Sequence, residues 1–204
     1  MQKIEKKYNS LCHSPSDINE HLPILYKYAQ ECESVIECGI RECISSWALV
    51  YGLLNNNKEN KKILLNDKIM CNTAELLNET KDLNIEINCK WENNLDLILN
   101  ENYDMVFIDT WHIYGHLKRE LSKFNLLINK YIIMHDTTID EIDGETIRCG
   151  WNASEQSIES GYDIEEINCG LGKAITEFLE NNKEWKLLEK LTNNNGLTIL
   201  KKNY

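Results

Sequence analysis

The chain has 204 residues, which suffices for one full-sized domain but not for two, so we treat 1–204 as a single domain. Hydrophobic residues make up 42% of the chain and charged residues 27%, as in ordinary soluble globular proteins. The 33 acidic side chains outnumber the 22 basic ones, and the formal net charge of −11 argues against nucleic acid as a partner.

The sequence also argues against a membrane or secreted location. No apolar stretch approaches the roughly 20 residues that a membrane-spanning helix needs, and no apolar segment follows the N-terminal lysines. We therefore expect a cytoplasmic protein without a membrane partner, and we leave a homo-oligomer open. The eight cysteines show no C-x-x-C spacing, so we expect reduced thiols that pack as small hydrophobic side chains.

Periodicity predicts alternating strands and helices along the chain. Residues 1–33 are expected to form a helical cap, in which Ser14 or Ser16 begins a helix. Five continuous apolar runs predict strands that are buried on both faces, at 34–40, 61–66, 85–90, 104–109 and 131–136. Helical spacing of apolar residues predicts helices between them, at 44–54, 73–83 and 114–128.

The order of these elements predicts the fold class. Alternating strands and helices indicate an α/β, doubly wound domain with right-handed crossovers. At the end of the chain, 184–191 and 197–202 are expected to pair across a turn at Asn195-Gly196. We therefore predict a mostly parallel seven-stranded sheet with an antiparallel C-terminal hairpin. The aperiodic segment 137–172 is expected to be a lid or loop that contacts a ligand through Trp151 and Tyr162.

The residues after the first strand discriminate between nucleotide cofactors. A dinucleotide site favours G-x-G-x-x-G, so that a pyrophosphate can approach the helix N-terminus. This chain has ECGIREC instead, with Glu37 ahead of the glycine and with Arg41 and Cys43 at the later positions. A carboxylate here repels a pyrophosphate but suits an ammonium or sulfonium group, and Asp67 can accept hydrogen bonds from ribose hydroxyls. The pattern favours S-adenosylmethionine over NAD.

Three groups of segments carry a family resemblance. VIECGIRECISSWA resembles the first motif of class I S-adenosylmethionine-dependent methyltransferases, in the form E-x-G-x-R-x-G-x-S-T. YDMVFIDTWHIYGHLKREL and YIIMHDTT are similar to the F-I-D-x-x-H-x-Y … H-D-T pattern of the cephalosporin-hydroxylase-like and macrolide or rhamnosyl O-methyltransferase branch. GLGKAITEFLENNKEW and GLTILKK resemble its C-terminal part, so the similarity extends over about 17–201. The resemblance implies a Rossmann-like methyltransferase fold.

The resemblance also implies an activity and a set of site residues. The reaction would be methyl transfer to a hydroxyl of a sugar or sugar-bearing small molecule, with His112 as general base beside Asp109. A divalent metal, Mg²⁺ by its preference for oxygen ligands, would be held by Asp109, His135 and Asp136. The residues implied to bind S-adenosylmethionine are Glu37, Gly39, Ile40, Arg41, Ser45, Asp67, Trp91, Glu92 and Asp109.

The chain departs from the family pattern at two places. Cys43 replaces a glycine of the first motif, and we expect its side chain to narrow the approach to the amino-acid end of the cofactor. Trp111 replaces a smaller residue, and it either reshapes the acceptor pocket or only packs. His116 is expected to face solvent, and His13 and His21 are given no functional role.

Two other functions stay open. One is an oxidoreductase that uses NAD on the same kind of sheet, against which the missing glycine motif and Glu37 count. The other is a non-catalytic relative that keeps the fold as a binding or assembly subunit. Cys43 in the cofactor loop is the feature that keeps this second alternative open.

Overall fold

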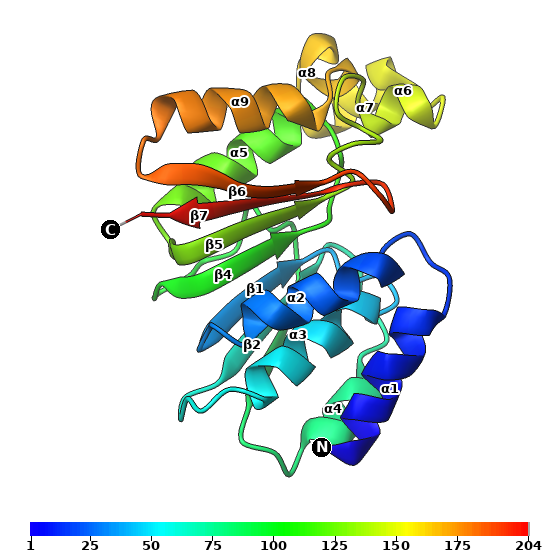
Figure 1. The fold of residues 1–204 in the computed structure, drawn as a ribbon. Coiled ribbons are helices and arrows are strands. Elements are labelled where there is room, and N and C mark those ends of the chain that lie inside the picture. The colour runs from blue at the N-terminus through cyan, green and yellow to red at the C-terminus, as the bar shows by residue number, and fades with distance from the viewer. Residues whose placement is uncertain (204) are drawn as a thin grey trace.

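A computed structural model describes residues 1–203, and within this range seven strands form one sheet (Figure 1). Across the sheet the strands are β3 (Glu86–Trp91), β2 (Lys62–Asp67), β1 (Ser34–Cys38), β4 (Tyr103–Ile108), β5 (Ile128–His135), β7 (Leu197–Lys202) and β6 (Trp185–Leu191). The first five strands are parallel, and β7 is antiparallel to both of its neighbours. The predicted sheet, including its C-terminal hairpin, is confirmed. The expectation that the run 85–90 is buried on both faces was wrong, because β3 lies at the edge of the sheet and none of its residues is buried.

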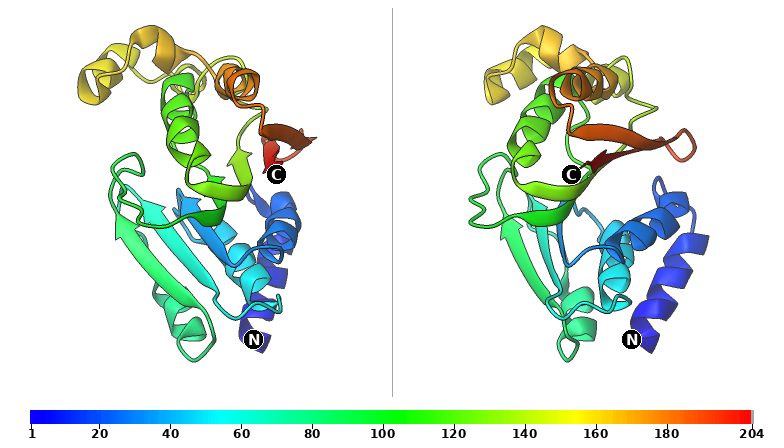
Figure 2. Two further views of the ribbon diagram at one scale, coloured as in Figure 1. Left: turned by 90° about the vertical axis from the view of Figure 1, so that its left-hand side faces the viewer. Right: turned by 60° about the vertical axis from the view of Figure 1, so that its left-hand side comes forward.

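Helices cover both faces of this sheet (Figure 2). One layer contains α1 (Gln2–His13), the short 3-10 helix η1 (Asn19–His21), α2 (Leu22–Ala29), α3 (Ile44–Leu54) and α4 (Ala74–Thr80). The other contains α5 (Tyr114–Asn125) and α9 (Leu171–Asn181). Three short helices, α6 (Glu145–Arg148), α7 (Ala153–Ser160) and α8 (Ile164–Asn168), lie beyond one end of α5 and α9 (Figure 1).

Each central strand contributes side chains to two separate cores. In β4, Met105 and Phe107 pack with the layer of α1 to α4, whereas Val106 and Ile108 pack with α5 and α9. Successive side chains of a strand point to opposite faces, so a strand buried on both sides needs a continuous apolar run. This explains why the sequence showed uninterrupted rather than alternating hydrophobic runs.

Two local predictions were wrong. Neither Ser14 nor Ser16 begins a helix, since α2 begins after His21 and has Pro23 in its first turn, where the missing N–H costs nothing. The hairpin connection is also longer than the expected two-residue turn, because it spans 192–196. Asn194, Asn195 and Gly196 all have positive φ there, of 45°, 70° and 102°.

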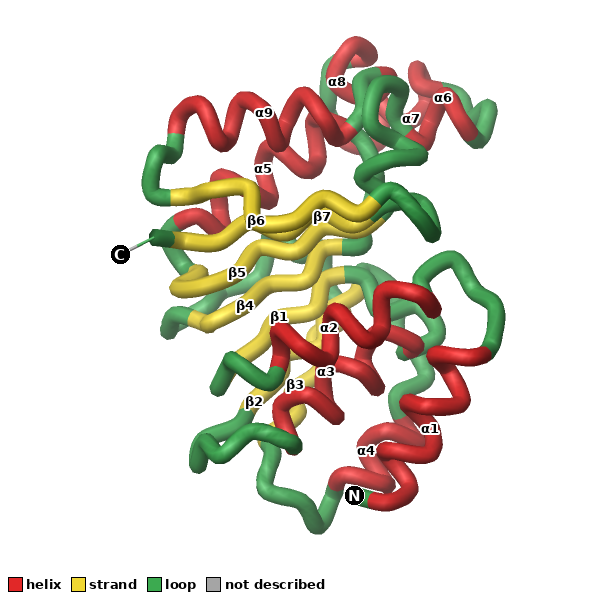
Figure 3. Tube along the Cα trace, viewed as in Figure 1, coloured by secondary structure: helices red, strands yellow, loops and turns green. Residues whose placement is uncertain are grey.

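The segment 137–172 contains more regular structure than its sequence indicated. Its three helices are only four, eight and five residues long and are separated by loops (Figure 3). The Asn152 side chain caps α7 by accepting hydrogen bonds from two backbone N–H groups, and Gly161 ends the helix with φ 73°. Helices this short bury few apolar residues, so they leave almost no periodicity to detect.

All eight cysteines, each within the described range, are free thiols. Cys32, Cys38 and Cys43 are buried, as expected for small hydrophobic side chains, whereas Cys149 is exposed. Along 1–203, no helix has both the length and the apolar character needed to cross a membrane.

Candidate active site

A cavity of about 1100 Å³ opens at the carboxyl ends of the parallel strands. It is bounded by the loops after β1, β2, β3 and β4 and by the segment that follows β5, as expected for a ligand site in a doubly wound sheet. Eight of the predicted site residues line it together: Gly39, Ile40, Arg41, Ser45, Asp67, Asp109, His112 and Asp136. The predicted residues that lie outside its lining are Glu37, Trp91, Glu92 and His135.

Gly39 allows the loop after β1 to approach β4. Its φ is 89°, and a Cβ atom at this position would lie 1.9 Å from the carbonyl oxygen of Asp109. No other residue type fits such a contact, because the opposing atom belongs to the backbone and cannot move aside. The glycine therefore brings the two loops that carry the candidate cofactor and catalytic residues against each other.

Asp67, at the end of β2, holds the same loop from the other side. Its carboxylate accepts hydrogen bonds from the backbone N–H groups of Ile40 (2.9 Å) and Arg41 (3.2 Å), and from that of Ile69 (3.0 Å). Partial burial alone would raise the pKa of Asp67, but these hydrogen bonds outweigh it and lower the pKa below its usual value. Asp67 is thus an ionised cap for the loop as well as part of the cavity wall.

Glu37 lies beneath the cavity, with an exposed fraction of 0%. The Ser45 hydroxyl donates a short hydrogen bond to one carboxyl oxygen, Oε1, and the other oxygen has no partner. Burial raises the pKa of Glu37 to about 8, although the Ser45 contact opposes the shift. Its predicted role in cofactor binding stays a prediction.

The expectation that Cys43 narrows the cofactor site was wrong. Its backbone is left-handed, with φ 60°, which explains why a glycine suits this position in the family motif. Its buried Sγ lies 3.6 Å from the carbonyl oxygen of Asn72, and the residue is not part of the cavity lining. The substitution therefore strains the loop without filling the site.

The loop after β3 contributes two residues to the cavity wall that were not predicted from the sequence. Asn93 and Asn94 line the cavity, whereas the predicted Trp91 and Glu92 do not. The Asn66 side chain donates to the carbonyl oxygen of Glu92 at 2.8 Å and so fixes where the loop begins. Strand β3 ends at Trp91, so only the following residues turn toward the cavity.

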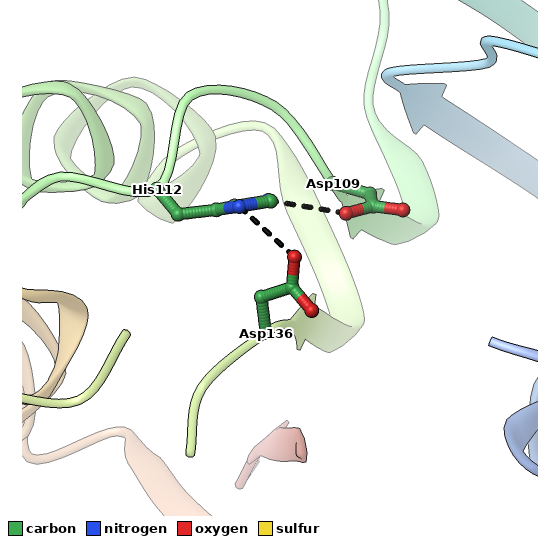
Figure 4. A group of neighbouring side chains, drawn as sticks. All are labelled: Asp109, His112 and Asp136. Atoms are coloured by element: carbon green, nitrogen blue, oxygen red, sulfur yellow. Dashed lines mark hydrogen bonds and ion pairs between the residues drawn. The ribbon is translucent and has the colours of Figure 1, made fainter. Parts of the chain in front are cut away.

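At the ends of β4 and β5, His112 lies between two aspartates (Figure 4). Its Nε2 is 3.1 Å from Asp109 Oδ1 and its Nδ1 is 3.0 Å from Asp136 Oδ2. Two further carboxylates approach Nδ1, that of Asp140 at 3.4 Å and that of Glu145 at 3.7 Å. The imidazole ring is therefore surrounded by four acidic side chains from three segments of the chain.

These contacts determine the protonation of the group. Burial alone would lower the pKa of His112, but Asp109, Asp136 and Asp140 outweigh it and raise the pKa well above its ordinary value. Burial would likewise raise the pKa of Asp109, but hydrogen bonds with His112 and His135 hold it below its usual range. Arg148 of α6 compensates Asp140, which it binds through two hydrogen bonds of 2.6 and 2.9 Å.

The same cluster of acidic side chains and imidazole could hold a divalent metal ion. One ligand atom from each of Asp109, His112 and Asp136 lies within 4.8 Å of the others. Asp136 Oδ1 and the Nδ1 atoms of His112 and His135 are buried and make no well-oriented hydrogen bond, although Asp136 oxygens lie 3.0 Å from His112 Nδ1 and 3.2 Å from His135 Nδ1. The two carboxylates suit Mg²⁺, and an added imidazole would extend the choice to transition metals.

His135 was predicted as a metal ligand, but its surroundings differ from those of Asp109, His112 and Asp136. Its Nδ1 is 3.4 Å from Asp109 Oδ1 and 3.2 Å from Asp136 Oδ1, yet it is not part of the three-residue group. Its Nε2 lies 3.2 Å from the carbonyl oxygen of Asn194, which also accepts a contact from Nε2 of His21 at 3.2 Å. His135 therefore contacts both aspartates from outside the three-residue group.

The expectation that His116 faces solvent was also wrong. It is 8% exposed and lies between Glu120 of the same helix, at 3.4 Å, and the Tyr162 hydroxyl, at 3.2 Å. The ring of Tyr162 stacks on Trp111 with an interplanar angle of 14°, and the Arg119 guanidinium lies 4.0 Å from its centre. Trp111 and Tyr162 thus line the cavity and pack against each other.

Comparisons with solved structures identify the fold. PaMTH1 of Podospora anserina, a methyltransferase solved with S-adenosylhomocysteine bound, is 11% identical, with a TM-score of 0.61 over 98% of this chain and 88% of that one. TomG of Streptomyces achromogenes, an O-methyltransferase in complex with S-adenosylmethionine, is 12% identical, with a TM-score of 0.58 over 100% and 89%. NodS of Bradyrhizobium japonicum, an N-methyltransferase with S-adenosylhomocysteine, is 11% identical, with a TM-score of 0.59 over 100% and 98%.

At these identities the similarity establishes the fold alone. No family model and no curated protein sequence matches the chain. The chain has the Rossmann-like fold of S-adenosylmethionine-dependent methyltransferases, as the sequence motifs predicted. Both O- and N-methyltransferases share it, so the fold does not decide which atom accepts the methyl group.

Proposed function

We propose that this protein transfers a methyl group from S-adenosylmethionine to a hydroxyl of a sugar or sugar-bearing small molecule, assisted by a divalent cation. The observation that carries the proposal is the position of His112. It lies between Asp109 and Asp136 in a cavity that the glycine loop after β1 also lines. A group suited to proton transfer thus shares one cavity with a loop suited to the cofactor.

Support for the cofactor comes from the β1 and β2 ends. Gly39, Ile40, Ser45 and Asp67 lie in one wall, where they can bind the amino-acid and ribose parts of S-adenosylmethionine. The acidic Glu37 beneath the loop disfavours the pyrophosphate of NAD, which is the alternative that the sheet itself would allow. Because Cys43 leaves this wall clear, the case for a non-catalytic relative is weaker.

For this reaction the site must activate the acceptor hydroxyl, which is a weak nucleophile. A bond forms between the acceptor oxygen and the methyl carbon as the carbon–sulfur bond breaks, which leaves S-adenosylhomocysteine. His112 would take the hydroxyl proton. Asp109 and Asp136 would hold the divalent cation, which supplies a positive charge that lowers the pKa of the acceptor hydroxyl. A cation on these carboxylates would also favour the neutral form of His112 that can accept a proton.

Support for an acceptor without phosphate comes from the charges of the opposite wall. Residues 137–172 contain nine acidic side chains and one basic one, and this imbalance repels anions. Both arginines that line the cavity are engaged, Arg41 with Asp17 at 2.6 Å and Arg148 with Asp140. A polyhydroxylated neutral molecule fits this wall, and Trp151, 48% exposed, offers it a stacking surface.

The first experiment separates the cofactors. Isothermal titration of the purified protein with S-adenosylhomocysteine and, separately, with NAD⁺ should show binding of the first and not of the second. Binding of NAD⁺ alone would overturn the proposal. Absence of binding by either would favour the non-catalytic relative.

The second experiment tests the reaction. Label from methyl-labelled S-adenosylmethionine should appear in neutral glycosides, disappear when EDTA is added and return with excess Mg²⁺. Turnover that EDTA leaves unchanged would remove the metal from the mechanism. Label found only in sugar phosphates would contradict the proposed acceptor class.

A further inference from the structure

The connection between β3 and β4 forms a cavity wall with little structure of its own. Its eleven residues, 92–102, contain no helix or strand, yet they place Asn93 and Asn94 against the cavity. Inside the loop, Asn93 accepts hydrogen bonds from the N–H groups of Asp96 (2.8 Å) and Leu95 (3.0 Å). A loop of this length needs outside contacts to keep one conformation.

Lys123 of α5 supplies those contacts. Its ammonium group donates to three carbonyl oxygens of the loop, those of Asn94 (2.7 Å), Leu95 (2.9 Å) and Leu97 (2.7 Å). An ammonium group has three donors, and here each one has a backbone acceptor. Hydrogen bonds from a charged donor are stronger than neutral ones, so this is the main clamp on the loop.

Glu120, one turn earlier on α5, holds the side chain of Asn94 by a hydrogen bond. It is 0% exposed and accepts a short hydrogen bond from the Asn94 amide and another from the Thr110 hydroxyl at 2.7 Å. Asn94 is 4% exposed, and its Oδ1 has no hydrogen-bond partner. Helix α5 thus fixes Asn94, which lines the cavity, through both its carbonyl oxygen and its side chain.

We propose that Lys123 is a positioning residue for the cofactor, which it affects through Asn93 and Asn94 without lining the cavity itself. The inference rests on the proposed function, since it assumes that S-adenosylmethionine occupies this cavity. Without the ammonium group the loop samples other conformations. Cofactor binding must then restore the loop conformation that binds the cofactor. The apparent affinity for the cofactor falls in proportion to the population of that conformation.

The test compares Lys123→Met with Lys118→Met. Methionine keeps an unbranched apolar stem in both, and Lys118 lies on the same helix but is half exposed and makes no contact with 92–102 in the described structure. We expect the Kd of S-adenosylhomocysteine to rise roughly tenfold or more in Lys123→Met, the loss that one to two charged hydrogen bonds represent. The KM for S-adenosylmethionine should rise similarly, with kcat at saturating cofactor changed less than about twofold. Lys118→Met should match the wild type.

Hydrogen exchange gives a second readout, in the wild type and in Lys123→Met. In the wild type, S-adenosylhomocysteine should slow amide exchange in 92–102. In Lys123→Met without ligand, the same amides should exchange faster while those of β4 and β5 keep their protection. An unchanged Kd in folded Lys123→Met, or a ligand that binds the wild type without protecting 92–102, would overturn the inference. A wild type that fails to bind S-adenosylhomocysteine would instead overturn the proposed function.

Discussion

At the ends of β1 and β2 the carboxylates are held by backbone N–H groups and a hydroxyl, whereas at the ends of β4 and β5 they are held by imidazole and guanidinium groups. Asp67 caps a loop, and Glu37 is buried beside Ser45. Asp109 and Asp136 instead share His112, and Asp140 binds Arg148. The first arrangement is fixed by chain geometry and the second by charge.

This difference indicates which part of the site changes when a ligand arrives. Hydrogen bonds to backbone groups persist as long as the loop keeps its conformation, so the cofactor side is preorganised. Contacts among ionised side chains depend on every charge nearby, including that of a metal ion. Variants at the ends of β1 and β2 should therefore affect cofactor affinity and stability, whereas variants at the ends of β4 and β5 should affect the reaction rate. Four variants can test this comparison.

The largest effect is expected for His112→Ala. Loss of a positioned base costs roughly 10²- to 10⁴-fold in rate, so kcat should fall by about that factor. The Kd of S-adenosylhomocysteine should change little, because the cofactor side is held independently. His13→Ala, at an exposed position outside the site, is the control. Full activity of His112→Ala in a fixed-time methyl-transfer assay would exclude the histidine as the base.

Gly39→Ala should cause the largest loss on the cofactor side. The added Cβ would lie 1.9 Å from the Asp109 carbonyl oxygen, in a backbone conformation that alanine disfavours. We expect a destabilisation of about 2–4 kcal/mol in urea unfolding and loss of measurable S-adenosylhomocysteine binding. Gly150→Ala has a similar φ of 67° and no atom within 4 Å, so it reports the cost of the backbone strain alone. Equal effects of the two substitutions would contradict the close approach.

Glu37→Gln should make stability less dependent on pH. The native pKa of about 8 exceeds the ordinary 4.5, so the folded state binds the extra proton between these values and wild-type stability falls as pH rises through them. The variant has no carboxyl group at this position to bind the proton, and its stability relative to the wild type should increase by about 3–4 kcal/mol between pH 5 and pH 8. Glu42→Gln, at an exposed position in the same loop, should show no such trend. Urea unfolding at both pH values measures the difference, and parallel curves would contradict the buried acid.

The smallest effect is expected for Cys43→Gly. Glycine relieves the left-handed strain but loses the buried thiol and gains unfolded-state freedom, so the net change in unfolding free energy should be within about 1 kcal/mol. The Kd of S-adenosylhomocysteine should stay within about twofold of the wild type. A gain in affinity of tenfold or more would mean that the thiol does obstruct the cofactor.

The sequence predicted most of the sheet because its signals were local. The helix 44–54 was predicted with its bounds, and the strands were found within a few residues, since the central strands show continuous apolar runs. Asp109, His112 and Asp136 were expected together because all three follow parallel strands, whose ends meet at one edge.

What the sequence did not reveal depends on contacts between distant segments. His116 looked exposed because its partner Tyr162 lies 46 residues away, in a segment without periodicity. Asn93 and Asn94 were missed because the direction in which a loop turns depends on Lys123, which the motif pattern does not include. The orientation of Cys43 follows from a left-handed backbone that a residue name alone does not indicate.

The pairing of the N-terminal cap with the final hairpin has a consequence for the order of folding. His21 meets the carbonyl oxygen of Asn193, 172 residues later, and the neighbouring carbonyl of Asn194 also receives His135 at the end of β5. Contacts at such separation close late, because much of the chain must already be in place. While the protein is being synthesised, β1 to β5 can therefore assemble before the clamp on His135 exists. The contact that holds His135 beside Asp109 and Asp136 should then form in the last step of maturation, after the bulk of the domain has become compact.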